Sequence, residues 1–209
     1  PSPVPLEEAV SLLKKFSNTK FDQSVETVLR LGVDPKLADQ NIRGAISLPH
    51  GIGKSVRVAV FAKGDNEEKA KSAGADIVGS DDLAKRIKDG FTDFDICLAT
   101  SDMMGVVGPL GRVLGPKGLM PTPKNGTVTS DIVTAVKEFK AGKVEYRTDP
   151  SGNLHVLVGK VSFSQDALVD NIRTLVSTIR AARPSSVKGV FVQGVTISAT
   201  MSPGIKVAI

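Results

Sequence analysis

Cysteine and histidine are scarce in this chain, which carries one cysteine and two histidines among 209 residues. The single thiol, Cys97, excludes a disulfide within the chain and any zinc site built from cysteines. It lies in an apolar run, so we expect a buried structural thiol rather than a nucleophile. His50 and His155 are far apart in sequence, and neither a histidine-rich metal site nor a Cys/His catalytic pair is expected. We predict no metal and no cofactor.

Long hydrophobic runs are also missing, and none approaches the roughly 18–20 residues of a membrane-spanning helix. The stretch 6–16 does not resemble a signal peptide, because Glu8 and Lys14 interrupt it. No membrane partner is therefore expected. The sequence starts at Pro1 rather than at a methionine, so we expect a processed or trimmed chain. Its length allows one large domain or two small ones.

Acidic residues are absent between Asp102 and Asp131, and within this window lies a segment that we call the glycine-proline loop, residues 111–128. It contains four glycines, three prolines and three cations, which are Arg112, Lys117 and Lys124. This composition does not suit a regular helix or a central strand. A fixed cationic loop of this kind would let phosphates approach the backbone closely. An Ω-loop closed only for packing has the same composition, and both interpretations stay open.

The net charge of +5 is unevenly distributed along the chain. Residues 1–52 hold six basic and six acidic residues, and residues 53–142 hold thirteen and twelve. Residues 143–209 hold eight and four, so most of the surplus lies in the C-terminal third. This excess favours an anionic partner, and a nucleic acid is the partner we expect.

Strands and helices alternate from residue 56 to residue 142, which predicts an α/β block with a parallel sheet. The expected strands are 56–62, 75–79 and 94–99, and the expected helices are 66–73, 81–89, 101–107 and a last one from Thr129 or Ser130 to Gly142. We expect Ser80 and Ser101 to cap two of these helices. Gly74 is expected to end the first.

The flanking regions predict an antiparallel α+β structure. The expected strands are 24–31, 42–48, 144–148, 154–161 and 194–199, and Ser164 should cap a helix over 165–183. The economical interpretation is a split α+β domain, 1–52 and 143–209, interrupted by a Rossmann-like three-layer α/β domain, 53–142. Gly51, Gly53 and Gly142 would serve as hinges at the crossings. A single mixed sheet is the alternative.

Enzyme motifs fail on their spacing. Residues 51–55, Gly-Ile-Gly-Lys-Ser, lack the first glycine of a phosphate-binding loop, since position 48 is leucine, and they lead into a strand rather than a helix. The glycine-proline loop does not contain the dinucleotide-binding pattern either. Asp81 and Asp82 are explained as the first turn of a helix, where negative charge is favoured. A nucleotide-dependent enzyme built on the α/β block is our second hypothesis, and we find no catalytic set for it.

Two segments suit RNA. Phe21 beside Lys20 precedes the strand on which Ser24 and Glu26 share a face; an exposed Phe21 would stack on a base or a ribose, and a buried one would belong to the core. Near the C-terminus, Thr196, Ser198, Thr200 and Ser202 form a row of hydroxyls that could bind riboses and phosphates or simply occupy an exposed strand.

The chain resembles the ribosomal protein L-one family of the large-subunit side stalk, in its bacterial and organellar form. The resemblance rests on segments spread over the chain: Thr19–Phe21, Ser24–Glu26, Asp39–Gly44, Leu48–Gly51, Val56–Val60, Ala73–Asp76, Leu110–Pro121, Gly126–Val128, Lys140–Arg147, Val158–Lys160, Asp170–Asn171, Lys188–Gly189 and Thr200–Met201. The glycine-proline loop is the most specific of them. The resemblance does not extend to the basic N-terminal tail that is typical of bacterial members.

The resemblance implies a large-subunit ribosomal protein without catalysis. It implies that large-subunit rRNA binds a strip around Lys20–Phe21 and Thr200–Met201 and that the protein helps release deacylated tRNA from the exit site. In bacteria it also implies repression of the protein's own mRNA. We expect the rRNA-binding residues to be Lys20, Phe21, Ser24, Glu26, Arg43, Lys160, Ser198, Thr200, Met201 and Ser202, with Arg112, Lys117 and Lys124 as secondary RNA contacts. Ser202 departs from the glycine that the family usually has there, so this sequence carries a Cβ at that position.

We expect a monomer within the ribosome of a mitochondrion or chloroplast, with bacterial cytoplasm as the alternative.

Overall fold

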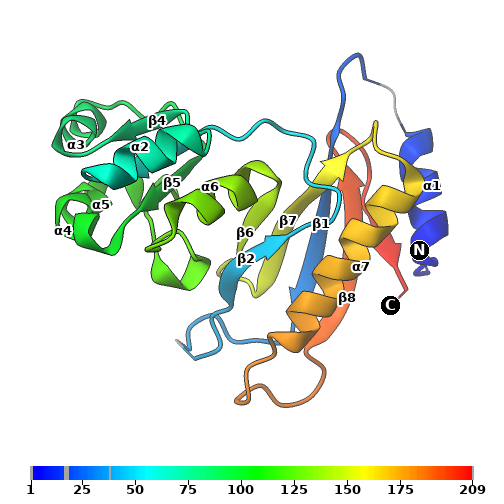
Figure 1. Ribbon diagram of the computed structural model, residues 1–209. Coiled ribbons are helices and arrows are strands. Elements are labelled where there is room, and N and C mark those ends of the chain that lie inside the picture. The colour runs from blue at the N-terminus through cyan, green and yellow to red at the C-terminus, as the bar shows by residue number, and fades with distance from the viewer. Residues whose placement is uncertain (1, 17–18, 38, 209) are drawn as a thin grey trace. The chain divides into compact units, whose positions relative to one another are not determined.

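The computed structural model describes residues 2–16, 19–37 and 39–208, which form two compact units. Unit 1 contains the residues up to 54 together with those from 142 onward, and unit 2 contains residues 55–141. Figure 1 shows both units with their elements labelled. The described part of the chain has no helix long and apolar enough to cross a membrane.

The centre of unit 1 is an antiparallel sheet in the order β7-β1-β8-β9, formed by β7 (Asn153–Lys160), β1 (Ser24–Leu31), β8 (Val192–Ala199) and β9 (Ile205–Val207). Burial alternates along β1, as the sequence predicted. The long helix α7 (Gln165–Ala181) packs on one face, and α1 (Leu6–Lys15) lies beside α7, β8 and β9 (Figure 1). Ser164 caps α7 by accepting from the Ala167 N–H, which confirms the predicted cap.

Unit 1 has a second, two-stranded antiparallel sheet of β2 (Arg43–Ser47) and β6 (Lys143–Arg147). The turn 149–152 links β6 to β7, so it joins the two sheets. The Asp149 carboxylate closes this turn by accepting from the backbone N–H groups of Ser151 and Asn153. These hydrogen bonds, the one from Asn153 first, lower the pKa of Asp149.

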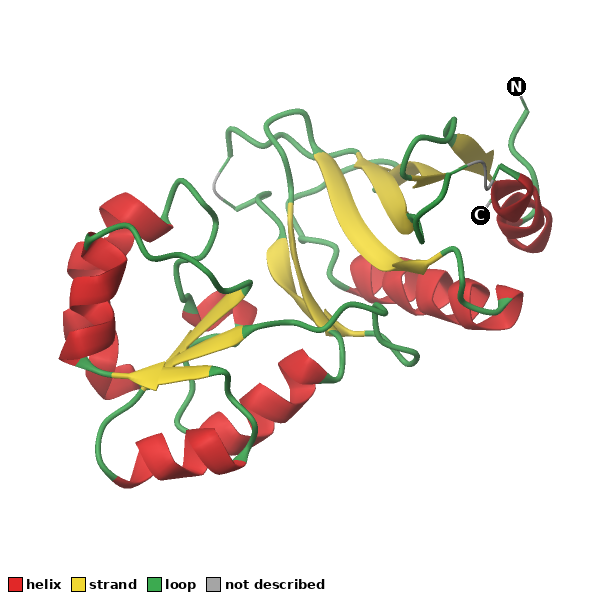
Figure 2. Cartoon of the chain, turned by 90° about the horizontal axis from the view of Figure 1, so that it is seen from above, coloured by secondary structure: helices red, strands yellow, loops and turns green. Residues whose placement is uncertain are grey.

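Unit 2 contains a three-stranded parallel sheet, β4-β3-β5, of β4 (Ile77–Gly79), β3 (Val58–Phe61) and β5 (Ile96–Ala99). Every residue of β3 is buried, as expected for the central strand of a sheet covered on both faces. Helices α2 (Asp65–Ser72), α3 (Asp81–Lys88) and α6 (Ile132–Lys140) lie on the two sides of this sheet (Figure 2). This α/β unit and the α+β unit confirm the predicted fold class, and the parallel strands have a sheet of their own.

Three predicted helix starts in unit 2 were wrong in detail. Ser80 precedes α3 but its side chain makes no capping hydrogen bond, and Ser101 lies inside the short helix η1 (Ser101–Met103) instead of before it. The last helix begins later than predicted, because Asp131 is its cap: its carboxylate accepts from the Thr134 N–H and hydroxyl. Those hydrogen bonds lower the pKa of Asp131. The edge strand β9 was not predicted.

The glycine-proline loop is more ordered than its composition suggested. After η1 come α4 (Met104–Val107) and η2 (Gly108–Leu110), and the loop itself contains α5 (Gly111–Leu114) and η3 (Pro123–Asn125). Leu114 is fully buried in the core that also holds the buried faces of β3 and β5. Thr127 and Val128 attach the end of the loop to β5 at Ala99. The expectation of no helix here was therefore wrong for one turn, since the apolar anchors outweigh the weak local propensity.

Candidate nucleic-acid interface

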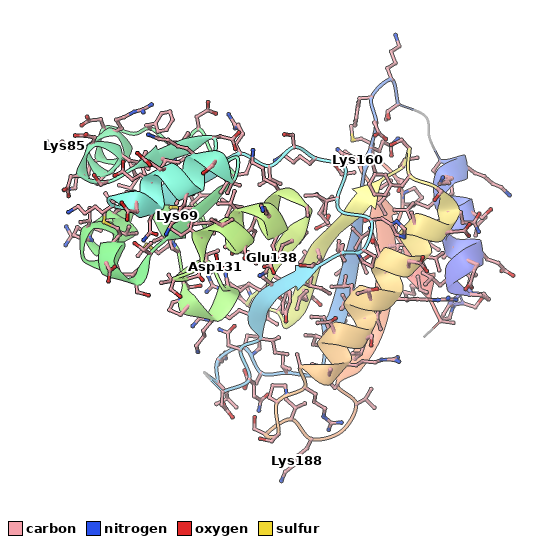
Figure 3. The ribbon with its side chains drawn as sticks, in the orientation of Figure 1. Lys69, Lys85, Asp131, Glu138, Lys160 and Lys188 are labelled. Atoms are coloured by element: carbon pink, nitrogen blue, oxygen red, sulfur yellow. The ribbon has the colours of Figure 1, made fainter. Side chains whose placement is uncertain are left out.

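The polar residues predicted to bind RNA come from distant parts of the sequence of unit 1, and they meet at one end of its four-stranded sheet. Ser24 begins β1, Lys160 ends β7, and Thr200 directly follows β8. Antiparallel pairing sets Ser24 opposite Lys160 and Val25 opposite Ala199, which brings Thr200 to the same place. We call the group formed by Lys20, Phe21, Ser24, Lys160, Thr200 and Met201 the strip. Lys160 is labelled at this end of the sheet in Figure 3.

Hydrogen bonds hold three members of the strip together. Lys160 Nζ donates to Ser24 Oγ at 2.8 Å. The Ser24 N–H donates to Thr200 Oγ1 at 3.2 Å, and the Thr200 N–H donates to the Ser24 carbonyl at 3.0 Å. An ammonium and two hydroxyls are thus fixed in place, and they are the groups that proteins use to contact ribose and phosphate.

Phe21 is 56% exposed, which decides between the two interpretations of this residue in favour of an open ring. It borders a hollow of about 480 Å³ together with Lys14, Asp22 and Gln23. An aromatic face beside a cationic side chain is a suitable platform for a nucleobase.

Two residues after Phe21, Asp22 and Gln23, were not predicted to belong to the site. The Asp22 carboxylate accepts from the backbone N–H and the hydroxyl of Ser162, at 3.1 and 2.7 Å, and so joins this segment to the end of β7. Gln23 is buried, and its Nε2 donates to Thr19 Oγ1 at 2.8 Å. Both hold the Phe21 segment against the sheet, and only their position beside the aromatic residue could have suggested it.

Met201 stands out for its backbone. Its φ is +66°, and it is the one residue other than glycine with positive φ among those the structure describes. Its side chain is 79% exposed. The Ser202 N–H donates to the Ala199 carbonyl at 2.9 Å, so Thr200 and Met201 form the two central positions of a tight turn. A methionine in a conformation that favours glycine costs about 1–2 kcal/mol, and such strain is concentrated at functional sites.

Ser202 is turned inward. Its hydroxyl accepts from the Ala199 N–H at 2.8 Å and donates to the Pro203 carbonyl at 3.3 Å. The hydroxyl is therefore used to close the turn that presents Thr200 and Met201. Ser202 supports the strip and is only partly exposed within it.

Glu26 and Ser198 lie one step along the same strands, directly opposite each other in the pairing of β1 with β8. His155 of β7 lies beside them, with Nδ1 3.6 Å from Glu26 Oε1 and Nε2 3.6 Å from Asp149 Oδ2. The predicted pair is thus adjacent to the strip, but its environment is acidic. Carboxylates at this point repel phosphates, so any contact of Glu26 with RNA would be to a hydroxyl or base donor.

Other predicted residues lie elsewhere. Arg43 is exposed on β2, opposite Arg147, and belongs to the two-stranded sheet rather than to the strip. Arg112, Lys117 and Lys124 are exposed on the glycine-proline loop of unit 2. Lys117 Nζ donates to Thr92 Oγ1 at 2.7 Å, so one of these three cations already has a neutral partner.

The expected hinge glycines are tightly packed. All three have positive φ, and a Cβ on Gly142 would lie 2.5 Å from the Gly51 Cα. On Gly53 it would lie 2.7 Å from the Phe163 ring. Glycine is therefore required at Gly53 and Gly142 for two reasons: neighbouring atoms leave no room for a Cβ, and φ is positive.

A buried amide that the sequence analysis did not single out fixes this crossing. Asn171 of α7 is fully buried; its Oδ1 accepts from the His50 N–H at 3.1 Å, and its Nδ2 donates to the Gly51 and Val158 carbonyls at 3.0 and 2.8 Å. The segment around Gly51 is thus anchored within unit 1. Only its occurrence in a motif of the family resemblance could have drawn attention to Asn171.

No group of three or more potential ligand side chains within the described residues could hold a metal ion. The strip offers positive charge, hydroxyls and exposed apolar surface, which are the groups that RNA-binding surfaces use.

A family model described as the ribosomal protein L1p/L10e family matches residues 13–203. The match includes all of unit 2, most of unit 1, the strip and the glycine-proline loop.

Proposed function

Because the chain belongs to the ribosomal protein L1p/L10e family, we propose that the strip is the surface through which it binds large-subunit rRNA. The family is one of structural ribosomal proteins that bind rRNA in the large subunit, and it is not an enzyme family. Residues 13–203 include every member of the strip.

One observation carries the proposal: exposed apolar side chains flank a fixed polar group. Phe21 and Met201 are 56% and 79% exposed, so both side chains are open to contact by a partner. Between them, Ser24, Lys160 and Thr200 are already oriented by hydrogen bonds. Stacking on Phe21, ribose contacts to the hydroxyls and phosphate contacts to Lys20 and Lys160 would use all of these groups.

The same proposal includes two further roles, in tRNA release and in mRNA repression, together with the oligomeric state and the location of the protein. The family resemblance supports a contribution to the release of deacylated tRNA from the exit site and repression of the protein's own mRNA, because an RNA-binding surface that recognises folded rRNA can also recognise a similar fold in mRNA. We propose that the protein acts as a monomer in the ribosome. The organellar location stays a prediction, which fluorescence localisation of the tagged protein would check.

A filter-binding assay with a stalk rRNA fragment tests the strip. We expect Phe21→Ala and Thr200→Ala each to weaken binding by roughly 1–3 kcal/mol. Leu37→Ala is the matched control, because Leu37 is 47% exposed and lies outside the strip. Unchanged affinity of both strip variants, with circular dichroism that shows native folding, would contradict the proposal.

A further inference from the structure

The face of the sheet that carries Ser24 continues well beyond the strip. On β1 the residues at alternate positions from Ser24 to Arg30 point to one side, while Val25 and Leu29 are buried on the other. Arg30 lies six positions after Ser24 on the same strand, a distance of roughly 20 Å. The far end of this face is not used by the strip.

A groove of about 730 Å³ lies at that far end. Cross-strand pairing sets Arg30 opposite Asn153 and Gly194, and it sets Lys206 opposite Thr196. Arg180 of α7 also lines the groove, so three cations from different elements converge on it. None of the described residues that line it is acidic, and none is aromatic.

The three cations, Arg30, Arg180 and Lys206, have no ion pair or side-chain hydrogen bond with any residue that the structure describes, and all three are exposed. By contrast Arg173, about two helix turns before Arg180 on α7, is paired with Glu7. Unpaired cations around one concave surface add their potentials and attract an anion. A Cβ on Gly194 would meet nothing within 4 Å, so the floor of the groove is open beside Arg30.

The groove and the strip are separate cationic surfaces. Glu26 and His155 lie on β1 and β7 between the two, and Asp149, in the turn 149–152, accepts from Asn153 Nδ2 at the edge of the groove. Arg30 also borders an adjoining hollow of about 530 Å³ with Lys188. In Figure 3, Lys188 and Lys160 are labelled at opposite ends of unit 1.

We infer that this groove binds the sugar-phosphate backbone of large-subunit rRNA, on a helix that flanks the segment held by the strip. Guanidinium groups suit phosphate because they bind its oxygens in pairs, and neutral side chains such as Asn153 and Thr196 suit ribose hydroxyls. Because the groove has, among its described lining residues, no aromatic side chain on which a base could stack, it contacts the RNA backbone rather than the bases. It therefore adds affinity without discriminating between nucleotide sequences. This inference rests on the proposed rRNA binding and adds a second anchor to it.

Nested fragments of stalk rRNA test the inference. A triple variant, Arg30→Gln, Arg180→Gln and Lys206→Gln, is compared with the wild type by filter binding at several salt concentrations. For fragments with flanking helices we expect binding about tenfold weaker or more, and a salt slope smaller by about 3. For the shortest fragment that the wild type still binds, we expect unchanged affinity.

The matched control removes the same charge from unit 2, through Lys69→Gln, Lys71→Gln and Lys85→Gln. Lys69 and Lys85 project from helices of unit 2 in Figure 3. Three results would each overturn the inference that the groove binds rRNA. The control variant could lose as much affinity as the groove variant, or the groove variant could lose the same affinity for short and long fragments. The groove variant could also bind long fragments as tightly as the wild type does. Failure of the wild-type protein to bind any fragment would instead overturn the proposed function.

Discussion

The strip and the glycine-proline loop use similar residue types in opposite ways. In the strip the apolar side chains Phe21 and Met201 point outward, at 56% and 79% exposure. In the loop the apolar side chains point inward: Leu114 is fully buried, and Leu119 and Met120 pack against the core of unit 2. Strained backbone in the strip carries a methionine, whereas positive φ in the loop falls on Gly118 and Gly126.

This difference shows that a distinctive sequence is not by itself a binding site. The loop is the most specific segment of the resemblance, yet most of its distinctive residues close the core of unit 2. The strip consists of short segments from three distant parts of the chain. What marks the strip is exposed apolar surface and strain around fixed polar groups, and both are properties of the folded chain.

The largest expected effect comes from an inward residue of the loop. Leu114→Ala removes a fully buried side chain and leaves a cavity, so we expect the free energy of unfolding of unit 2 to fall by about 2–5 kcal/mol. Denaturant unfolding measures it. rRNA binding below the unfolding transition should stay at the wild-type level. A large loss of binding by folded protein would break the comparison, because it would make the loop part of the principal site.

Asn171→Ala tests the anchor in unit 1. The substitution leaves the His50 N–H and the Gly51 and Val158 carbonyls without their partner, so we expect a loss of roughly 2–4 kcal/mol in the free energy of unfolding. Ser177→Ala on the exposed side of the same helix is the control. Equal stability of the two variants would show that the buried amide does not anchor the crossing.

Met201→Gly separates stability from function within the strip. Glycine adopts positive φ without strain, so we expect the free energy of unfolding to rise by up to about 1 kcal/mol. The exposed side chain is lost, and rRNA binding should weaken. Thermal unfolding and filter binding measure the two quantities on one protein. If binding were also improved, the strain at Met201 would serve no purpose in recognition.

Neutralising the loop cations compares the two regions directly. We expect the combined variant Arg112→Gln, Lys117→Gln and Lys124→Gln to lose less affinity for stalk rRNA than Thr200→Ala alone. These side chains supply charge without oriented hydroxyls or an exposed ring, so their contribution is general attraction that salt screens. Filter binding at two salt concentrations measures the loss of affinity. A loss greater than that of Thr200→Ala would show that the loop contributes more to rRNA affinity than the strip does.

The smallest effects concern acid stability, with one carboxylate in each unit. Hydrogen bonds lower the pKa of Asp131 in unit 2 and of Asp149 in unit 1. The stabilisation from each is present above the pKa of about 3.9 that an unfolded Asp has, and it is lost as the pH falls through the lower folded value.

Asn substitutions isolate that acid dependence. Asp131→Asn keeps a side chain that caps helices well but does not titrate, so the unfolding temperature of this variant should fall less steeply on acidification than that of the wild type. Asp149→Asn should act in the same direction on unit 1. Parallel curves of unfolding temperature against pH for variant and wild type would contradict the linkage.

Much of the local structure could be predicted because its causes are local. The alternation along β1 and the Ser164 cap of α7 were correct, since each depends on residues a few positions apart. Helix starts failed where several capping residues competed: Asp131, not Thr129 or Ser130, caps α6. The strand β9 was missed because it has three residues and depends on pairing with β8.

The sequence by itself determined the scarcity of catalytic and metal-binding residues, the two kinds of secondary-structure pattern and, through the resemblance, the family. Only the tertiary structure decided that Phe21 is open, that Ser202 turns inward and that Arg43 lies on another sheet. It also decided that Arg30, Arg180 and Lys206 share one groove. The physical reason is that periodicity reports which face of an element is buried, whereas strand pairing over more than a hundred residues sets which exposed side chains become neighbours.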